Sequence, residues 1–256
     1  MIALETRSLN KSFGSLAVAQ DVSLAFASEG RYALIGPNGA GKTTYFNLLA
    51  GNLRPDSGAI LLAGRDVTGL DVTRRARIGI ARSFQRNNLF PDCTVRENLA
   101  FACALRAGLA PVFWRPMQRM RAPLSEADAI AVQVGLADVL DTLARHLSYG
   151  SQRQLEVALA LACRPKVLLL DEPTSGMSPE ETTRMCALIA GLPRSLTLIV
   201  IEHDMDVVLD FAEQIIVLDY GRVLAQGTPA EIRASRLVRE RYLGEHAFGG
   251  EAAGAP

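Results

Sequence analysis

The stretch Gly36-Pro37-Asn38-Gly39-Ala40-Gly41-Lys42-Thr43-Thr44 decides the fold, because it fits the pattern G-x-x-x-x-G-K-[ST]. It follows an apolar run at residues 32–35, predicted to be a buried strand, and it precedes a predicted helix that begins near Lys42. The three glycines let the backbone curl so that successive N–H groups face one point. The helix start adds the positive end of its dipole. The sequence therefore predicts a phosphate-binding loop for ATP or GTP.

Two side chains of this loop would carry its chemistry. Lys42 can reach the β- and γ-phosphates, and the hydroxyl of Thr43 can hold Mg²⁺. A glycine turn beside an unrelated lysine is the simpler alternative. The order strand, loop, helix favours nucleotide binding over that alternative.

The composition excludes several classes of protein. The chain has 256 residues, enough for one large domain, and its 27 basic and 27 acidic side chains give a formal net charge of zero. No overall field therefore draws it to nucleic acid. The four cysteines form no C-x-x-C pair, and with no signal peptide this favours a reducing cytosol and packing roles for the thiols. No apolar run approaches the roughly 20 residues of a membrane span, so any membrane attachment would come through another protein.

Strand and helix signals alternate over most of the chain, which predicts a mostly parallel sheet covered by helices. The N-terminal part favours antiparallel strands at 2–9 and 18–26, joined by a turn at 13–15. From about 95 to 139 helical patterns replace the strands, with an irregular, proline-rich arm at 108–123. The single tryptophan, Trp114, is expected in the core of that arm. Residues 228–243 are predicted as one terminal helix, and 245–256 as a disordered tail.

A second nucleotide signal lies in Val167-Leu-Leu-Leu170-Asp171-Glu172, four apolar residues closed by two acids. Beside a phosphate-binding loop, Asp171 is placed to hold Mg²⁺ opposite Thr43. Glu172 points to the other face of the strand end, where it can deprotonate a water molecule. A buried strand that merely meets a loop would look the same in isolation. Together with the loop at 36–44, the pair indicates hydrolysis.

The segment Leu147-Ser148-Tyr149-Gly150-Ser151, followed by Gln152-Arg153, resembles the Leu-Ser-Gly-Gly-Gln signature of ABC-type ATPases. The resemblance extends in order and spacing from about residue 2 to 243. It identifies Gln85 with the glutamine that contacts Mg²⁺ and nucleotide in that family, residues 175–178 with the loop after the acidic strand, and His203 with the switch histidine. Phe13 matches the aromatic residue that stacks on adenine.

The resemblance implies a dimer that sandwiches two ATP molecules and Mg²⁺. Each ATP would be held by the phosphate-binding loop of one subunit and by the signature, here Ser148, Tyr149, Gly150 and Ser151, of the other. A serine and a backbone amide at a helix start suit an anion, although Ser148 could equally be a plain helix cap. The chain departs from the family pattern at Tyr149, at Ser151 and at Ser178, which replaces a loop aspartate. None of these departures alters the residues assigned to hydrolysis: Lys42, Asp171, Glu172 and His203.

His203 and Phe13 each have a simpler explanation. A histidine after a strand is often only a satisfied loop residue. His203, however, lies two positions after the end of a predicted strand at 196–201, where it could donate to a γ-phosphate and align Glu172 with water. An aromatic side chain in a turn, such as Phe13, packs against protein as often as it stacks on a ligand.

A narrower likeness points to the ATP-binding subunits of branched-chain amino acid importers, which share features with urea and amide importers. It rests on Ala81–Gln85, Leu89–Pro91, Leu147–Gly150 and Glu202–Met205, together with Gly227–Ile232 and Tyr242–Gly244. It implies that the chain hydrolyses ATP to drive a membrane permease, with a solute-binding protein as an indirect partner. It also implies a second ATPase subunit, either a copy or a paralogue, and a place on the cytoplasmic face of the cell membrane. The permease would dock near 85–91 and the helical insertion.

Two other functions stay open at this point. A soluble ABC ATPase of repair or translation would need a long coiled coil or a second cassette, and the sequence contains neither. A nucleotide-binding regulatory scaffold would not need Glu172 and His203. The expected architecture is an α/β P-loop core at 1–94 and 140–244, with an N-terminal antiparallel β subdomain and a helical subdomain at about 95–139.

Overall fold

The computed structural model describes residues 1–83, 89–109 and 121–243. Its larger sheet has six strands in the order β10-β9-β3-β8-β7-β6. The central members are β3 (Arg31–Ile35), β8 (Thr197–Ile201) and β7 (Val167–Asp171), which are buried along their whole length. β6 (Ile80–Arg82) pairs in parallel with β7, and β9 (Gln214–Asp219) pairs in parallel with β3. Only β10 (Arg222–Gly227) runs antiparallel to its neighbour, so the expected mostly parallel sheet is confirmed.

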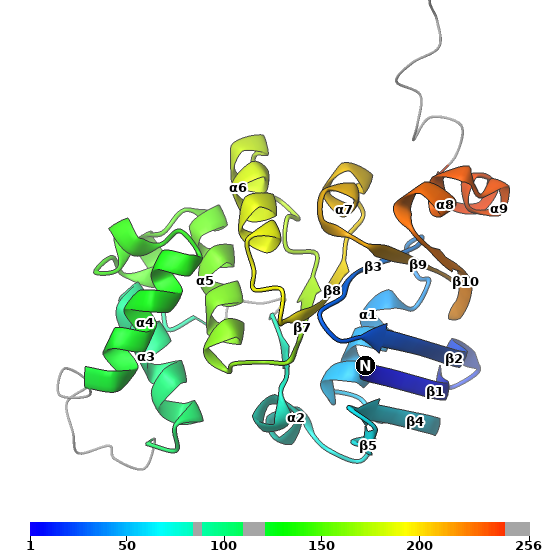
Figure 1. Ribbon diagram of the computed structural model, residues 1–256, viewed down its shortest axis with the longest axis horizontal. Coiled ribbons are helices and arrows are strands. Elements are labelled where there is room, and N and C mark those ends of the chain that lie inside the picture. The colour runs from blue at the N-terminus through cyan, green and yellow to red at the C-terminus, as the bar shows by residue number, and fades with distance from the viewer. Residues whose placement is uncertain (84–88, 110–120, 244–256) are drawn as a thin grey trace, which may run out of the picture.

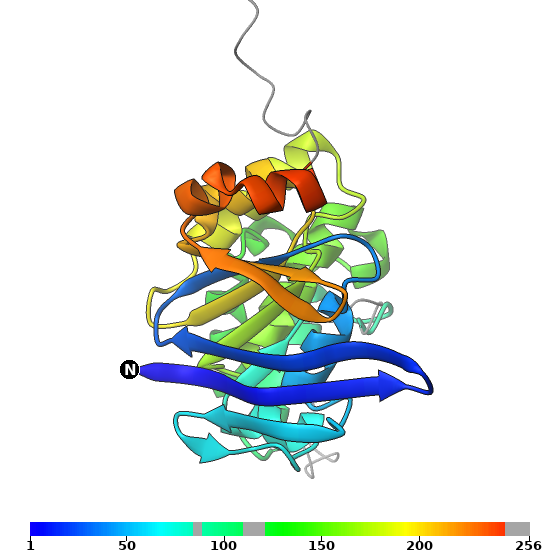
Figure 2. The same cartoon turned by 90° about the vertical axis from the view of Figure 1, so that its right-hand side faces the viewer.

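A second, antiparallel sheet packs beside the first. Its order is β2-β1-β4-β5, with β1 (Ile2–Phe13), β2 (Leu16–Ala27), β4 (Ser57–Leu62) and β5 (Arg65–Asp66). Figure 2 shows these strands lying next to β9 and β10. The predicted N-terminal antiparallel unit, with its turn after Phe13, is therefore confirmed.

Helix α1 (Lys42–Ala50) lies between the two sheets, and its buried face joins them into one apolar cluster. Tyr45 and Phe46 are buried there beside Phe26 of the antiparallel sheet and Leu169 of the parallel sheet. The hydroxyl groups of Tyr45 and Thr6 lie 3.0 Å apart, so the buried phenol is satisfied across the layers. Because α1 begins where the phosphate-binding loop ends, this packing fixes the loop.

Helices α6 (Pro179–Ala190), α7 (Met205–Phe211), α8 (Pro229–Ala234) and α9 (Arg236–Val238) line the side of the parallel sheet away from α1 (Figure 1). The helical insertion, at the opposite end of the molecule from β1 and β2, contains α3 (Val95–Arg106) and α4 (Arg121–Gln133), and α5 (Tyr149–Ala162) follows it in the chain. Short 3₁₀ turns at Ala137–Val139 and Ala144–His146 connect α4 to α5. The short helix α2 (Val72–Ile78) precedes β6.

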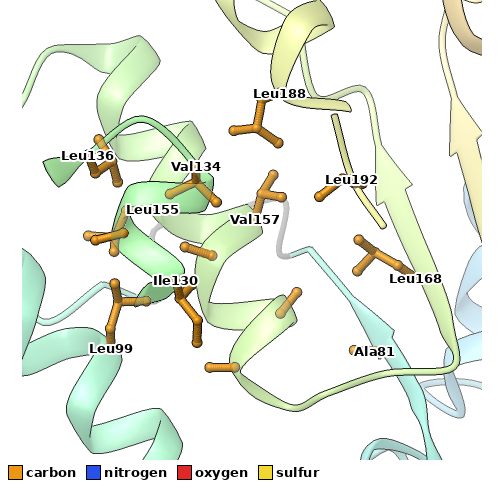
Figure 3. Close-up of a cluster of buried hydrophobic side chains, with 14 of the residues drawn as sticks. Ala81, Leu99, Ile130, Val134, Leu136, Leu155, Val157, Leu168, Leu188 and Leu192 are labelled. Carbon is orange, nitrogen blue, oxygen red and sulfur yellow. The ribbon is translucent and has the colours of Figure 1, made fainter. Parts of the chain in front are cut away.

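The helical insertion and the sheet share one apolar cluster. Figure 3 shows Leu155 of α5 close to Leu99 of α3 and Ile130 of α4, while Val157 of α5 points toward Leu188 of α6. Leu168 of β7 closes the cluster on the sheet side. Helix α5 is therefore the element through which the insertion is packed against the nucleotide-binding core.

Three boundaries differ from the sequence expectations. The sequence pattern favours a helix at 152–162, but α5 begins at Tyr149, because Ser148 accepts a hydrogen bond from the Ser151 N–H and caps the helix three residues earlier. The predicted single helix at 228–243 is wrong. Ser235 has extended backbone and caps α9 through the Val238 N–H, so it separates α8 from α9, and a π-helical turn follows at Arg239–Leu243.

The third boundary is the start of α4. The sequence pattern favours a helix at 125–136, but α4 begins at Arg121, with Pro123 inside its first turn. A first-turn N–H has no partner within the helix, so proline costs little at that place. Residues 110–120 with Trp114, and the tail at 245–256, lie outside the described residues.

The C-terminus of α1 is held by one buried cation. The guanidinium of Arg75 on α2 is fully buried and donates to the carbonyl oxygens of Leu48 (2.6 Å), Leu49 (2.7 Å), Leu70 (3.0 Å) and Thr68 (3.0 Å). Leu48 and Leu49 belong to the last turn of α1, where carbonyl groups lack helical partners and a positive charge is favoured. Arg75 therefore helps to fix the helix that carries Lys42.

We predict that Arg75→Met lowers the free energy of unfolding by about 2–4 kcal/mol, because it removes a charged hydrogen-bond donor from each of these four carbonyl groups. Equilibrium denaturation with guanidinium chloride would measure the change. The control is Arg74→Met at the neighbouring position. The Arg74 side chain is exposed and pairs with Asp71, so a change within about 0.5 kcal/mol is expected. Equal effects of the two substitutions would show that Arg75 does not hold α1.

Candidate functional site

The phosphate-binding loop follows β3 and ends at the first residue of α1. Two glycines are required by the packing around it. A Cβ on Gly36 would lie 2.1 Å from the Leu218 carbonyl oxygen, and one on Gly41 would lie 2.3 Å from the Val18 carbonyl oxygen. Their φ angles, 149° and 97°, also disfavour other residues. The Gly221 N–H donates to the Ala40 carbonyl oxygen, so the β9–β10 turn supports the loop from outside.

The start of α1 has no acceptor of its own. Gly41 stands at the N-cap position with no side-chain hydrogen bond, and the first turn contains no acidic residue. The N–H groups of this turn and the helix dipole therefore suit a bound anion. The predicted loop residues Pro37, Asn38, Gly39, Thr43 and Thr44 lie in this curl or in the first turn of α1.

Lys42 is buried beneath the loop. Its Nζ donates to the carbonyl oxygens of Gly36 (2.7 Å) and Pro37 (2.9 Å). Burial lowers the pKa of Lys42, while the carboxylates of Glu172 and Asp171 act in the opposite direction. The lysine and the two acids that end β7 therefore share one electrostatic site, as the sequence predicted.

Asp171 is paired with a residue that the sequence analysis did not select. Arg82, at the end of β6, donates from Nη2 to Asp171 Oδ2 at 2.5 Å and from Nη1 to the Asn47 side chain at 2.6 Å. Burial raises the pKa of Asp171, and Arg82 opposes the rise. The available signal was an arginine ending the short, otherwise apolar strand Ile80–Arg82, beside the expected Gln85.

The second carboxylate oxygen of Asp171, Oδ1, is buried and has no hydrogen-bond partner among the described residues. A buried carboxylate oxygen without a donor fits a hard cation such as Mg²⁺, which prefers oxygen ligands. Asp171 and the hydroxyl of Thr43 are thus compatible with the predicted metal site. The third predicted metal contact, Gln85, lies outside the described residues.

Glu172 and His203 lie in contact. Glu172 Oε1 is 2.6 Å from His203 Nε2, and both side chains are partly exposed to solvent. Glu172 has a φ of 47°, in the left-handed region that is costly for a residue with a side chain, and its N–H donates to the Ile201 carbonyl oxygen. The left-handed backbone turns the chain directly after Asp171. The two predicted catalytic side chains therefore come together at the ends of β7 and β8.

A buried carboxylate, Glu202, sits behind this pair and was used in the sequence analysis only for a family likeness. Its Oε1 accepts from the N–H (3.0 Å) and the hydroxyl (2.7 Å) of Thr174, and its Oε2 accepts from the His203 N–H (3.2 Å). Glu202 thus connects Thr174, in the loop after β7, to the backbone of His203. Burial raises the pKa of Glu202, although the Thr174 hydrogen bonds favour its ionised form.

The predicted signature forms the first turn of α5. Ser148 is its N-cap, and Tyr149, Gly150 and Ser151 follow. The Tyr149 hydroxyl donates to the Ser175 carbonyl oxygen at 3.1 Å and accepts from Arg153 Nε at 3.0 Å. The larger side chain at 149 therefore connects α5 to the loop after β7. The structure describes every residue of the segments 36–44 and 148–151. Within this chain no hydrogen bond or ion pair joins these two segments.

One acidic side chain at this turn was missed altogether. Glu181 Oε1 accepts from the Ser148 hydroxyl (3.0 Å) and the Gly150 N–H (2.9 Å). Ser178, the residue that replaces the loop aspartate, is the N-cap of α6 and forms a capping box with Glu181. The sequence S-x-x-E at 178–181 could have revealed that box, but not the contact with α5.

Phe13 lies at the tip of the β1–β2 hairpin with about half of its surface exposed, and Lys11 Nζ is 5.7 Å from its ring centroid. Its role as an adenine platform stays a prediction.

Comparison with known proteins connects this geometry to a family. A family model described as ABC transporter matches residues 19–175, which is more than half of the chain. The chain belongs to the ABC transporter ATP-binding family. A second model, described as branched-chain amino acid ATP-binding cassette transporter, matches residues 222–247.

Relatives at the sequence level cover nearly the whole chain. The high-affinity branched-chain amino acid transport ATP-binding protein LivG of Salmonella typhimurium is 40% identical over 249 residues, which cover 94% of this chain and 98% of LivG. BraF of Pseudomonas aeruginosa, which carries the same description, is 39% identical with the same coverage. The lipopolysaccharide export system ATP-binding protein LptB of Haemophilus influenzae is 35% identical over 96% of this chain and 98% of LptB.

Solved structures agree with the family. A nucleotide-free ATP-binding cassette from an ABC transporter has a TM-score of 0.83 and 27% identity, covering 96% of this chain and all of that chain. An ADP conformation of an ATP-binding cassette also has a TM-score of 0.83, with 28% identity and the same coverage. The chain is therefore an ATP-binding-cassette ATPase, as the resemblance implied. None of the helices that the structure describes has the length and apolarity to cross a bilayer.

We predict that Glu202→Gln changes the pH dependence of stability. With its pKa raised above 4.5 in the folded state, Glu202 keeps its proton on folding while the unfolded chain loses it. The free energy of unfolding of the wild type, relative to that of the variant, should therefore fall as the pH rises from about 4.5 through the raised pKa. The fall should be about 1.4 kcal/mol for each unit by which the pKa is raised.

Urea denaturation at a series of pH values would measure this difference. Glu231→Gln is the control, since hydrogen bonds from Thr228 lower the pKa of Glu231 and the trend should have the opposite sign. A wild-type-to-variant difference at Glu202 that does not vary with pH would contradict the prediction.

Proposed function

We propose that this chain is the ATP-hydrolysing subunit of a membrane importer for branched-chain or other amino acids. The observation that carries the proposal is the 2.6 Å contact between Glu172 and His203 beside the phosphate-binding loop of an ABC cassette. The importer assignment is supported by the identity to LivG and BraF, which exceeds that to LptB, and by the branched-chain model at residues 222–247. The comparisons offer no support for a soluble ABC ATPase outside transport.

ATP would bind with its phosphates in the curl of 36–41 and its adenine toward Phe13. The unshared N–H groups at the start of α1 would bind phosphate oxygens, and Lys42 would exchange its two carbonyl partners for the β- and γ-phosphates. Thr43, Asp171 and Gln85 would hold Mg²⁺. When bound, Mg²⁺ would neutralise charge that develops on the β- and γ-phosphates.

Hydrolysis would use the two partly exposed side chains at the strand ends. Glu172 takes a proton from a water molecule, whose oxygen then attacks the γ-phosphorus in line with the β–γ bridging oxygen. The contact with His203 holds the carboxylate in place, and the imidazole can donate to the γ-phosphate as negative charge develops there. Glu202 orients His203 from behind through the backbone N–H. The bond to the ADP oxygen breaks, and inorganic phosphate leaves.

A complete site would need a second subunit. The Ser148 hydroxyl and the Gly150 N–H form a pair of donors at the start of α5, but they do not contact the loop of their own chain. Such donors suit a γ-phosphate bound by the opposite subunit. The partner subunit would be a copy of this chain or a related ATPase. Residues 1–244 of this chain would form one ATPase domain.

The permease would dock on the segment around Phe90 and on α3. Phe90 has half of its surface exposed and packs edge-on against Phe101 of α3, with ring centroids 5.3 Å apart. Leu105 at the end of α3 and Leu109 are also exposed. Exposed apolar side chains next to the predicted Gln85 would let a helix of the permease sense the nucleotide site. The subunit would then lie on the cytoplasmic face of the cell membrane, with the solute-binding protein as an indirect partner.

We predict that Glu172→Gln reduces ATP hydrolysis by about 10²–10⁴-fold, the usual contribution of a positioned general base. The amide keeps the size of the side chain but cannot take a proton from water. ATP affinity should change little, because Lys42 and the loop N–H groups remain. The variant should accumulate as a dimer in ATP but not in ADP, which size-exclusion chromatography with light scattering would detect.

Glu180→Gln is the matched control, since it removes one charge from an exposed acid that accepts a hydrogen bond from the Ser178 hydroxyl. The assay should include the permease and the related ATPase, because the working pair can be mixed. Hydrolysis by Glu172→Gln at the wild-type rate in the complete transporter would refute the assignment of the base.

We predict that p-benzoylphenylalanine at position 90 crosslinks to the permease in membranes. The replacement keeps an aromatic ring at an exposed site, so the fold should tolerate it. The control position is Leu237 on α9, also exposed, where no permease crosslink is expected. Mass spectrometry would identify the product, and crosslinks from position 90 to soluble proteins alone would contradict the docking surface.

A further inference from the structure

The donors of the signature turn already hold an anion in the free subunit. Glu181 Oε1 lies 3.0 Å from the Ser148 hydroxyl oxygen and 2.9 Å from the Gly150 nitrogen. These are the two groups that the proposed function assigns to the γ-phosphate of the opposite subunit. A carboxylate oxygen and a phosphate oxygen make the same kind of hydrogen bond to such donors.

The backbone at position 150 is shaped for this close approach. A Cβ on Gly150 would lie 2.7 Å from the carboxyl carbon and from Oε1 of Glu181, closer than real side-chain contacts allow. A side chain at 150 would therefore displace the carboxylate from the N–H. The same absence of a side chain is what a phosphate oxygen would require there.

Glu181 is held in this place by a second helix start. Its Oε2 accepts from the Ser178 N–H at 3.3 Å, and its own N–H donates to the Ser178 hydroxyl. One carboxylate thus serves the first turns of α5 and α6 together, where both helix dipoles favour negative charge. These donors lower the pKa of Glu181, so the side chain is ionised at neutral pH.

We propose that Glu181 is a specificity-determining residue for closure of the ATPase dimer. Its carboxylate occupies the signature donors until the γ-phosphate of the opposite subunit's nucleotide replaces it. The inference rests on the proposed function, because the phosphate must arrive from a second subunit. ADP has no γ-phosphate to compete for these donors, so Glu181 excludes it from closing the dimer.

After displacement, the Glu181 carboxylate has another positively charged partner on its own helix, α6. Arg184 stands one turn further along α6, at the spacing at which helix side chains meet, and its charge already acts on Glu181. Glu181 can move toward Arg184, and Ser178 still caps α6 through its own hydroxyl. In this exchange the γ-phosphate accepts the hydrogen bonds of the signature donors, and the Glu181 carboxylate moves away from the negatively charged phosphate.

A purely structural cap makes a different prediction. If Glu181 only ties α5 to α6, its removal loosens the signature turn, and dimer closure then needs more ATP. If Glu181 competes with phosphate, its removal lowers the ATP requirement. The direction of the change therefore separates the two roles.

The test uses the full chain carrying Glu172→Gln, so that hydrolysis does not consume the ATP. Dimer formation with ATP and Mg²⁺ is followed by light scattering, together with the related ATPase if the pair is mixed. Adding Glu181→Gln should lower the ATP concentration for half-maximal dimer by about three- to tenfold, because the amide is a weaker competitor and carries no charge to repel phosphate. Adding Glu180→Gln removes the same charge one residue away and should leave the value within about twofold.

An unchanged or increased ATP requirement with Glu181→Gln would overturn the inference, as would an equal fall with Glu180→Gln. If Glu172→Gln itself forms no dimer in ATP, the proposed function fails instead, so the two failures are distinct. Glu181→Asp provides a second variant in case the amide misfolds. It keeps the charge but withdraws the oxygens from Gly150, and it too should lower the ATP requirement.

Discussion

Parallel pairing of β3, β8 and β7 is the constraint on which the rest of the structure depends. The register places Leu34 opposite Ile201 and Ile201 opposite Asp171, so the three strands end at the same edge of the sheet. Residues far apart in the chain, the loop after 35, the acids at 171–172 and the pair at 202–203, therefore meet there. Ligand sites of open parallel sheets form at this edge for the same reason. Small shifts of register would separate Lys42 from Glu172.

Much of this site could be predicted from sequence because its signals are local. The phosphate-binding loop is one run of nine residues. The two acids directly follow one apolar run, and the histidine lies two positions after the end of another. The order of the strands in the sheet and the exact ends of the helices were harder to predict from the sequence. Ser148 starts α5 earlier than its low-propensity neighbours suggested, and Ser235 ends α8 although the apolar spacing continues. In both cases a single side-chain cap outweighs helix propensity.

The missed residues share a different cause. Arg82 with Asp171, Glu202 with Thr174 and Glu181 with Ser148 are pairs separated by 89, 28 and 33 positions. No spacing rule connects such residues, because their contact depends on how whole elements pack. Each partner also has an ordinary local role, as a strand-end arginine, a post-strand acid or a helix cap. Only the packed structure shows that Arg82 and Glu181 touch residues assigned to the nucleotide site, and that Glu202 joins Thr174 to the His203 N–H.

These contacts mean that nucleotide binding would be an exchange of partners. In the free chain Lys42 is held by two carbonyl groups, Asp171 Oδ2 by Arg82, and the signature donors by Glu181. A buried lysine or aspartate without such partners would cost several kcal/mol, so the free subunit stays folded because its own groups satisfy them. The affinity for nucleotide is then a difference between two sets of contacts. Asp171 avoids part of this competition, since Oδ1 is left for a cation while Arg82 stays on Oδ2. The two signature donors, in contrast, are both taken by one carboxylate oxygen of Glu181, so closure of the proposed dimer would have to displace that carboxylate.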